Sequence, residues 1–114
     1  MVQLLVRLVA PETRVKELVH ALRAVIRGAQ QARGCRFAEI CVPIGDFRRV
    51  NYVEEWDDEA ELRAQFLSER FVRLLALIET AAEPPVMEFR FISKIQGLEY
   101  IATAGMSPSL RSNG

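Results

Sequence analysis

The sequence has no long hydrophobic run, no secretion signal and no surplus of charge of one sign. No apolar segment approaches the roughly 20 residues that a helix needs to span a bilayer. The start of the chain lacks the charged region and the small-residue cleavage site of a signal peptide. Fifteen basic and fifteen acidic residues cancel, whereas nucleic-acid binding needs a positive surplus on some face. We therefore expect a cytoplasmic protein with no membrane or nucleic-acid partner.

Residues that hold metals and cofactors are also scarce. The chain has a single histidine, His20, which leaves no histidine-rich metal site and no catalytic triad. Its glycines are scattered, so it has no glycine-rich phosphate-binding loop. Its two cysteines, Cys35 and Cys41, belong to one predicted strand and its lead-in. At about 3.3 Å per residue they lie roughly 20 Å apart, beyond disulfide reach. We expect two reduced thiols, no metal and no cofactor.

The hydrophobic periodicity predicts a single α+β domain. Strands and amphipathic helices follow one another in the order β-α-β-β-α-β, which is the ferredoxin-like arrangement with an antiparallel sheet. The expected elements are a strand at 2–9, a helix from 11 to the Gly34 region, a hairpin of strands at 36–42 and 49–56, a second helix that starts after Asp57 and Asp58 and breaks near Ser68, a fourth strand at 86–95 and a weak fifth at 98–102. The domain is expected to cover residues 1–104, and residues 105–114 are expected to form a flexible tail.

Both faces of the predicted sheet carry apolar side chains. In the first strand, Val2, Leu4 and Val6 alternate with Leu5 and Val9, so neither alternation is polar. Helices cover one face of a ferredoxin-like sheet, and the other face would be polar if the domain stood alone in water. We therefore expect a homodimer with its sheets face to face, a dimeric α/β barrel. A tail that covers the sheet is the alternative.

The third strand carries the residues best suited to a site. Tyr52, Glu54 and Trp56 share one face by the period of two, and a phenol, a carboxylate and an indole in a row could form a ligand wall. The alternative is a packed strand whose carboxylate is paired with an arginine. The candidate partners for that pair are Arg7, Arg36, Arg48 and Arg90.

Two other polar residues are placed away from this wall. His20 lies about opposite the apolar stripe of the first helix, on the face expected to be solvated, so a surface role is favoured over acid-base catalysis. Asn51 is an odd number of residues before Trp56 and falls on the opposite face of the strand.

The stretch from Tyr52 to Trp56, followed by the run from Leu62 to Phe71, resembles the antibiotic biosynthesis monooxygenase family. That family has a strand ending in Glu-x-Trp, an acidic helix start, and then a Leu-x-Ala-His-x-x-Ser-x-x-Phe run. The resemblance extends loosely over residues 2–102. It implies a dimeric α/β barrel with a pocket between sheet and helices, in which a phenolic or quinol-type aromatic is oxygenated by O2 without metal or flavin. The protein's task is then to hold the ring and stabilise its anion.

The chain departs from the family pattern at several positions. The helix histidine is Gln65 here, a second frequent histidine is Arg70, and Tyr52 replaces an asparagine found in some active members. Phe66 stands where haem-degrading relatives carry a histidine, which argues against haem degradation.

Two functions follow from this reading. In the first, the chain is a monooxygenase of a small phenol or quinol, with Glu54 as base or anchor, Tyr52 as hydrogen-bond donor, Trp56 and Phe66 as stacking walls and Gln65 beside the substrate. The resemblance and the absence of cofactor motifs favour it. In the second, the chain is a non-catalytic dimeric module that binds or senses a small hydrophobic metabolite, and the missing histidines favour that.

Overall fold

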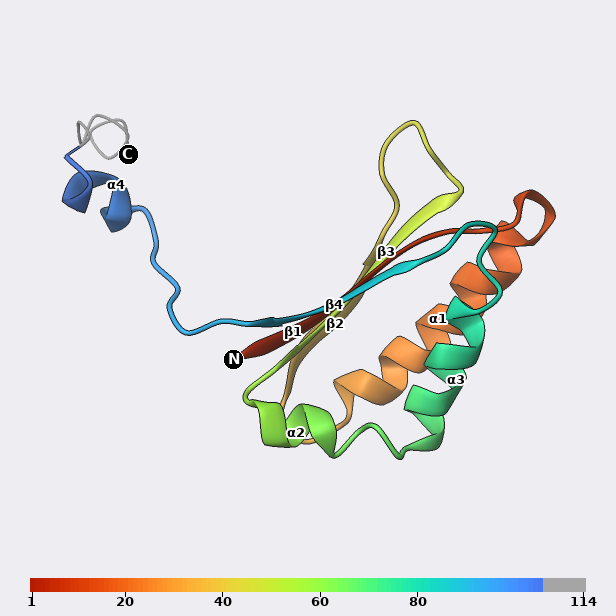
Figure 1. The fold of residues 1–114 in the computed structure, drawn as a ribbon, viewed down its shortest axis with the longest axis horizontal. Helices are drawn as coiled ribbons and strands as arrows, with labels where there is room; N and C mark the ends of the chain where they lie inside the picture. The colour runs from red at the N-terminus through yellow and green to blue at the C-terminus, as the bar shows by residue number, and fades with distance from the viewer. Residues whose placement is uncertain (106–114) are drawn as a thin grey trace.

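A computed structural model describes residues 1–105 and shows a four-stranded antiparallel sheet with helices on one of its faces (Figure 1). The strands lie in the order β2-β3-β1-β4. Their bounds are β1 Val2–Val9, β2 Cys35–Cys41, β3 Arg49–Trp56 and β4 Val86–Phe91. The helices are α1 Val15–Gln30, α2 Glu59–Arg63, α3 Glu69–Ile78 and α4 Glu99–Thr103, with a short 3-10 turn at Glu12–Arg14. The ferredoxin-like prediction is confirmed.

The core lies between α1, α3 and one face of the sheet. In β1 and β3 the even-numbered side chains are buried and face the helices, while the odd-numbered ones face the other way. The predicted apolar stripe of α1 supplies the opposite wall of the core, with Leu18, Leu22, Val25, Ile26 and Ala29 buried. A helix whose apolar residues recur every three or four positions buries one face in this way.

The predicted break near Ser68 is confirmed. The Ser68 hydroxyl accepts a hydrogen bond from the Phe71 backbone N–H at 3.1 Å and so begins α3 as a new helix. Asp58 caps α2 in the same way, through the Glu61 N–H at 2.9 Å. Such caps satisfy backbone donors that have no partner within the helix. The short link between the helices, residues 64–68, carries two of the predicted site residues.

The end of the chain differs from the prediction. The fourth strand stops at Phe91 rather than at residue 95, because its partner β1 begins at Val2 and leaves nothing further to pair with. The last ladder contact is the Ile92 N–H donating to the Met1 carbonyl at 2.8 Å. The weak fifth strand expected at 98–102 is wrong, since residues 99–103 form the short helix α4. Apart from Gly105, the predicted tail lies outside the described residues.

The face of the sheet away from the helices, called the open face below, mixes apolar and charged residues. Its centre is the Leu5–Val53 pair, flanked by Glu39 and Glu88 on the neighbouring strands. Phe37 and Val86 are exposed toward its edges. The apolar residues expected on this face are present, and between them lie more charges than the first strand alone suggested.

Candidate functional site

The side chain of Glu54 is the only charged one that is fully buried among the described residues. It projects from β3 toward the helices and accepts hydrogen bonds from three side chains. Trp56 donates its indole Nε1–H to Oε1 at 3.0 Å, Tyr52 donates its hydroxyl to Oε2, and Arg70 donates Nη1–H to Oε2 at 2.7 Å. A buried carboxylate needs this compensation, because removing it from water is costly. We call Tyr52, Glu54, Trp56 and Arg70 the carboxylate cluster.

Arg70 comes from the first turn of α3 and forms the outer part of the cluster. Its side chain is 12% exposed, and besides the ion pair with Glu54 it donates Nη2–H to Gln65 Oε1 at 3.1 Å. The guanidinium carbon lies 5.8 Å from the centre of the Trp56 ring, within range of a cation–π contact. The Arg70 Nε–H is buried and has no hydrogen-bond partner within residues 1–105. Each such unpaired buried donor calls for an explanation.

Burial raises the pKa of two groups at the cluster. It raises the pKa of the Tyr52 phenol, and the neighbouring Glu54 carboxylate raises it further, so the phenol remains a hydrogen-bond donor at neutral pH. Burial, with a smaller contribution from Glu54, also raises the pKa of the Cys35 thiol, which packs beside Trp56. Cys35 and Cys41 are both free, as the spacing predicted.

An aromatic group lies in the link that follows α2. Phe66, in the link between α2 and α3, is exposed, and its ring centre lies 5.0 Å from that of Phe71 and 6.0 Å from that of Phe89. Tyr52 and Trp56, in contrast, are completely buried. Phe66 is therefore the solvent-accessible ring of this region, in the link whose Gln65 binds Arg70.

The structure joins four of the five predicted site residues through Glu54 and Arg70, namely Tyr52, Glu54, Trp56 and Gln65. Phe66 is the neighbour of Gln65 and contacts Phe71 and Phe89 instead. Tyr52, Glu54 and Trp56 share the helix-side face of β3. Gln65 and Phe66 follow in the adjoining link. His20 is exposed on α1, and Asn51 points to the open face, paired in register with Arg7 and Cys41.

The four arginines proposed as partners of Glu54 are wrong. Arg36 pairs with Glu55 at 3.4 Å, Arg7 and Arg90 pair with Glu88 at 3.9 and 3.4 Å, and Arg48 donates to the Ala10 carbonyl. The partner is Arg70, which the sequence analysis considered only as a replaced histidine. The sequence spacing could have indicated that Arg70 points toward the core. Arg70 precedes the buried Leu74 by four residues, and residues four apart share a helix face.

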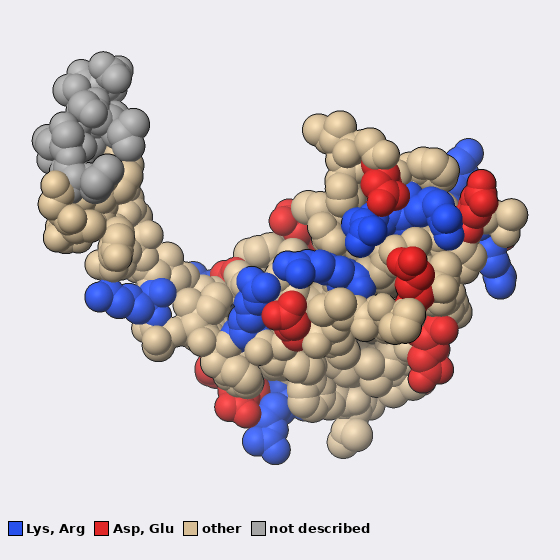
Figure 2. Space-filling view, turned by 45° about the horizontal axis from the view of Figure 1, so that its top comes forward, with Lys and Arg blue, Asp and Glu red and all other residues tan. Residues whose placement is uncertain are grey.

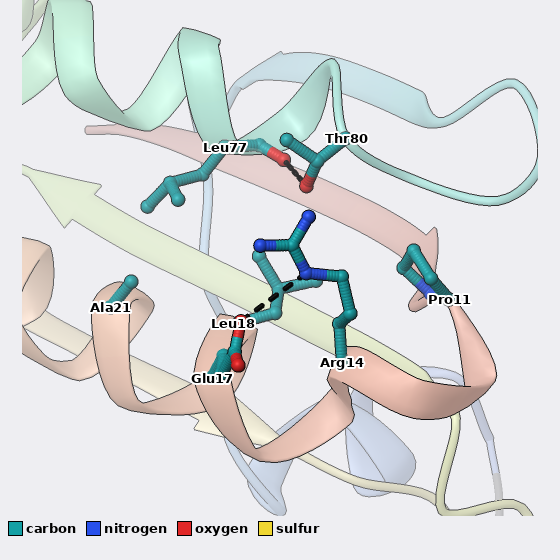
Figure 3. Close-up of a pocket in the computed structure, with 7 residues that line it drawn as sticks. All are labelled: Pro11, Arg14, Glu17, Leu18, Ala21, Leu77 and Thr80. Atoms are coloured by element: carbon teal, nitrogen blue, oxygen red, sulfur yellow. Dashed lines mark hydrogen bonds and ion pairs between the residues drawn. The ribbon is translucent and has the colours of Figure 1, made fainter.

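Gly28 of α1 makes room for Arg70. A Cβ atom at position 28 would lie 2.8 Å from Arg70 Cδ, too close for two carbon atoms. The absence of a side chain there lets the arginine stem pass between the two helices and reach Glu54. The far end of the α1–α3 pair holds a separate hollow of about 220 Å³, which Arg14 spans with its Nε 3.2 Å from Glu17 (Figure 3). None of the predicted site residues lines it.

Other kinds of site are not in evidence in the described part of the chain. Within residues 1–105 no three histidine, cysteine or acidic side chains come together in a way that could hold a metal ion. Over the same residues, no helix is both long and apolar enough to cross a membrane. On the face shown in Figure 2, basic and acidic side chains are interspersed rather than gathered by sign.

These features define a class of protein: a ferredoxin-like domain that holds a carboxylate, an indole, a phenol and a guanidinium between its sheet and its helices. The chain belongs to the antibiotic biosynthesis monooxygenase family, whose model matches residues 1–77, from β1 almost to the end of α3. The resemblance stated from the sequence is thereby confirmed. No curated protein matches the chain.

Solved structures support the same fold. A structure described as an antibiotic biosynthesis monooxygenase has a TM-score of 0.71 at 19% identity, over 82% of this chain and 100% of its own. A protein from Nitrosomonas europaea has a TM-score of 0.73 at 14% identity, over 82% and 100%. A third, from Deinococcus radiodurans, has a TM-score of 0.76 at 12% identity, over 86% and 98%.

Proposed function

We propose that this chain is a cofactor-independent monooxygenase that oxidises a small phenolic or quinol-type aromatic with O2. The observation that carries the proposal is the unpaired Arg70 Nε–H, a buried donor whose guanidinium lies near the Trp56 indole and binds Gln65, the neighbour of the exposed Phe66. A phenolate oxygen would pair with such a donor, and the flat ring that bears it would pack on the aromatic side chains. Family membership supports the same class of reaction.

The chemistry needs little from the protein beyond binding and electrostatics. In an anthrone-like substrate, one ring CH2 is oxidised to a carbonyl: the carbon loses two hydrogens and keeps one oxygen atom of O2. The other oxygen leaves with the two hydrogens as water. The electrons come from the substrate anion, so the site must stabilise that anion and exclude water. Arg70 supplies the positive charge, and the aromatic rings supply a dry environment.

Glu54 and Tyr52, predicted from the sequence as catalytic, take different parts in this proposal. The Glu54 carboxylate already accepts three hydrogen bonds and has no exposed surface. A free base would need an open lone pair facing the substrate. We assign Glu54 the positioning of Arg70, and Tyr52 and Trp56 the positioning of Glu54. We assign Phe66, which is exposed in the link beside Gln65, the packing of the substrate ring.

Oxygen uptake is the direct test of this function. We expect purified protein to consume O2 with a panel of quinols and anthrone-like phenols well above their autoxidation, and the Trp56→Phe variant to lose most of that rate. The phenylalanine keeps a ring but removes the indole N–H that holds Glu54. An Arg23→Gln variant, changed on the exposed face of α1, serves as the control and should retain the full rate. Uptake that the protein does not accelerate for any member of the panel would contradict the proposal.

The second candidate function is a non-catalytic module that binds a small hydrophobic metabolite. The complete engagement of Glu54 favours it, because no base in the cluster is free. Trp56 is the chain's single tryptophan, so its fluorescence reports directly on the cluster. Saturable quenching by a phenol that causes no oxygen uptake would decide for the binding module.

We also propose that the chain works as a homodimer joined through the open face. The Leu5–Val53 pair lies at the centre of this face and would be buried by a second copy. We expect Val53→Glu to place a charge at that contact and raise the dimer dissociation constant at least tenfold in sedimentation equilibrium. Arg23→Glu on α1 should leave it unchanged. A wild-type chain that stays monomeric at all accessible concentrations would contradict the proposal.

A further inference from the structure

A second space of ligand size lies at the end of the helix layer away from the carboxylate cluster. It is the hollow of about 220 Å³ between the start of α1 and the end of α3 (Figure 3). Arg70 stands in the first turn of α3 and Leu77 in the last, so roughly 10 Å of helix separates the two places. The open face is on the other side of the sheet, and a second copy docked there would leave this hollow accessible.

The lining of the hollow is mostly apolar. Four of its seven lining residues are Pro11, Leu18, Ala21 and Leu77. Leu18 belongs to the hydrophobic core, and Leu77 packs against it. An apolar ring that displaces water from such a surface is stabilised by the hydrophobic effect. The volume is below the roughly 300 Å³ at which pockets for drug-sized molecules begin, so the hollow suits a molecule with a single ring.

Arg14 places a positive charge over this apolar lining. Its Nε lies 3.2 Å from Glu17 Oε2, but its two terminal nitrogens have no hydrogen-bond or ion-pair partner within residues 1–105. In Figure 3 they point away from Glu17, toward Leu77 and Thr80 on the opposite side of the hollow. The Thr80 hydroxyl is itself occupied, because it donates to the Leu77 carbonyl at 2.7 Å. Two free terminal nitrogens of a planar guanidinium are suited to bind both oxygens of a carboxylate.

We propose that this hollow binds a small carboxylic acid that carries one apolar ring. The carboxylate lies on the terminal nitrogens of Arg14, and the ring packs between Leu18, Ala21 and Leu77. Glu17 engages only Nε, and the two side chains of that pair are 67% and 71% exposed. An exposed pair contributes little to stability, so the arginine is free to adjust to a ligand. The site is separate from the proposed oxidation and stands or falls independently of oxygen uptake.

Titration of isotope-labelled protein with benzoate, followed by NMR, tests the site. We expect saturable shifts of the backbone amide signals around Ala21 and Leu77. Acetate, which lacks the ring, and benzamide, which lacks the charge, are expected to bind at least tenfold more weakly. An acetate or benzamide affinity equal to that of benzoate would overturn the proposal, and so would the absence of saturable shifts in these signals.

Two variants of the full chain locate the ligand. Arg14→Gln removes the charge and Ala21→Leu puts a larger side chain into the hollow, so each should raise the dissociation constant of benzoate at least tenfold. The matched controls are Arg63→Gln, which removes an exposed arginine paired with Glu59, and Ala76→Leu at an exposed position of α3. Neither control should change the constant more than twofold. Circular dichroism checks the fold of all four, and unchanged benzoate binding by Arg14→Gln or by Ala21→Leu would contradict the site.

Discussion

Replacing Arg70 with methionine is expected to lower the free energy of unfolding by about 3–5 kcal/mol, the usual cost of removing one partner of a buried ion pair. Methionine fills much of the arginine's volume, but it leaves the Glu54 carboxylate buried without a cation. Denaturation in urea, followed by circular dichroism, measures the loss. The matched control is Arg90→Met, which removes an exposed pair with Glu88 and should cost no more than about 1 kcal/mol.

A double-mutant cycle separates the ion pair from the packing of the arginine stem. Glu54→Gln removes the negative charge and keeps the shape of the side chain. In the Arg70→Met background that second change should restore part of the lost stability, because no charge then remains buried. Two losses that simply add would show that Arg70 and Glu54 do not stabilise each other, contrary to the geometry.

Truncating Trp56 to alanine should destabilise the domain by a similar amount, about 3–5 kcal/mol. The indole is completely buried and packs with Val2 and Leu62, so its removal leaves a large cavity and also deprives Glu54 of one donor. Because the variant has no tryptophan, unfolding must be followed by circular dichroism rather than by fluorescence.

Two variants calibrate the result for Trp56. Trp56→Phe keeps most of the packing and loses the hydrogen bond, so it should cost about 1–3 kcal/mol. Phe47→Ala removes an exposed ring from the loop before β3 and should change stability by less than about 0.5 kcal/mol. A Trp56→Ala loss as small as that of Phe47→Ala would mean that the indole does not belong to the core.

The sequence predicted the body of the fold because its signals there are local. The apolar β-rich run in residues 2–9 predicts a strand, the stripe along α1 predicts a helix and its buried face, and Ser68 marks a helix start through its own side chain. At the end of the chain the length of the last strand is decided by a distant segment, its partner strand β1. Whether residues after Phe91 remain in the sheet depends on where β1 begins, which no pattern within 86–102 records.

The residues that β3 contributes to the candidate site were predicted from the sequence, whereas Arg70 of α3 was not predicted as the partner of Glu54. The period of two placed Tyr52, Glu54 and Trp56 on one face, because strand geometry fixes side-chain direction. The choice of an arginine for Glu54 depended instead on how α3 lies over the sheet. Arg7 and Arg36 are on or next to strands that pair with β3, yet they find partners on the open face. Arg70 comes from the helix above and meets the carboxylate in the core.

The bare position at Gly28 has a consequence for comparing relatives. The stem of Arg70 occupies the volume that a side chain at position 28 would need. A large side chain therefore fits at position 28 or at position 70, but not at both. Relatives that carry a larger residue at the first position should carry a shorter one at the second, and a relative that keeps the arginine should keep the glycine. Joint variation of these two positions would thus sort family members by the presence of a buried guanidinium, even where the Glu-x-Trp motif itself is unchanged.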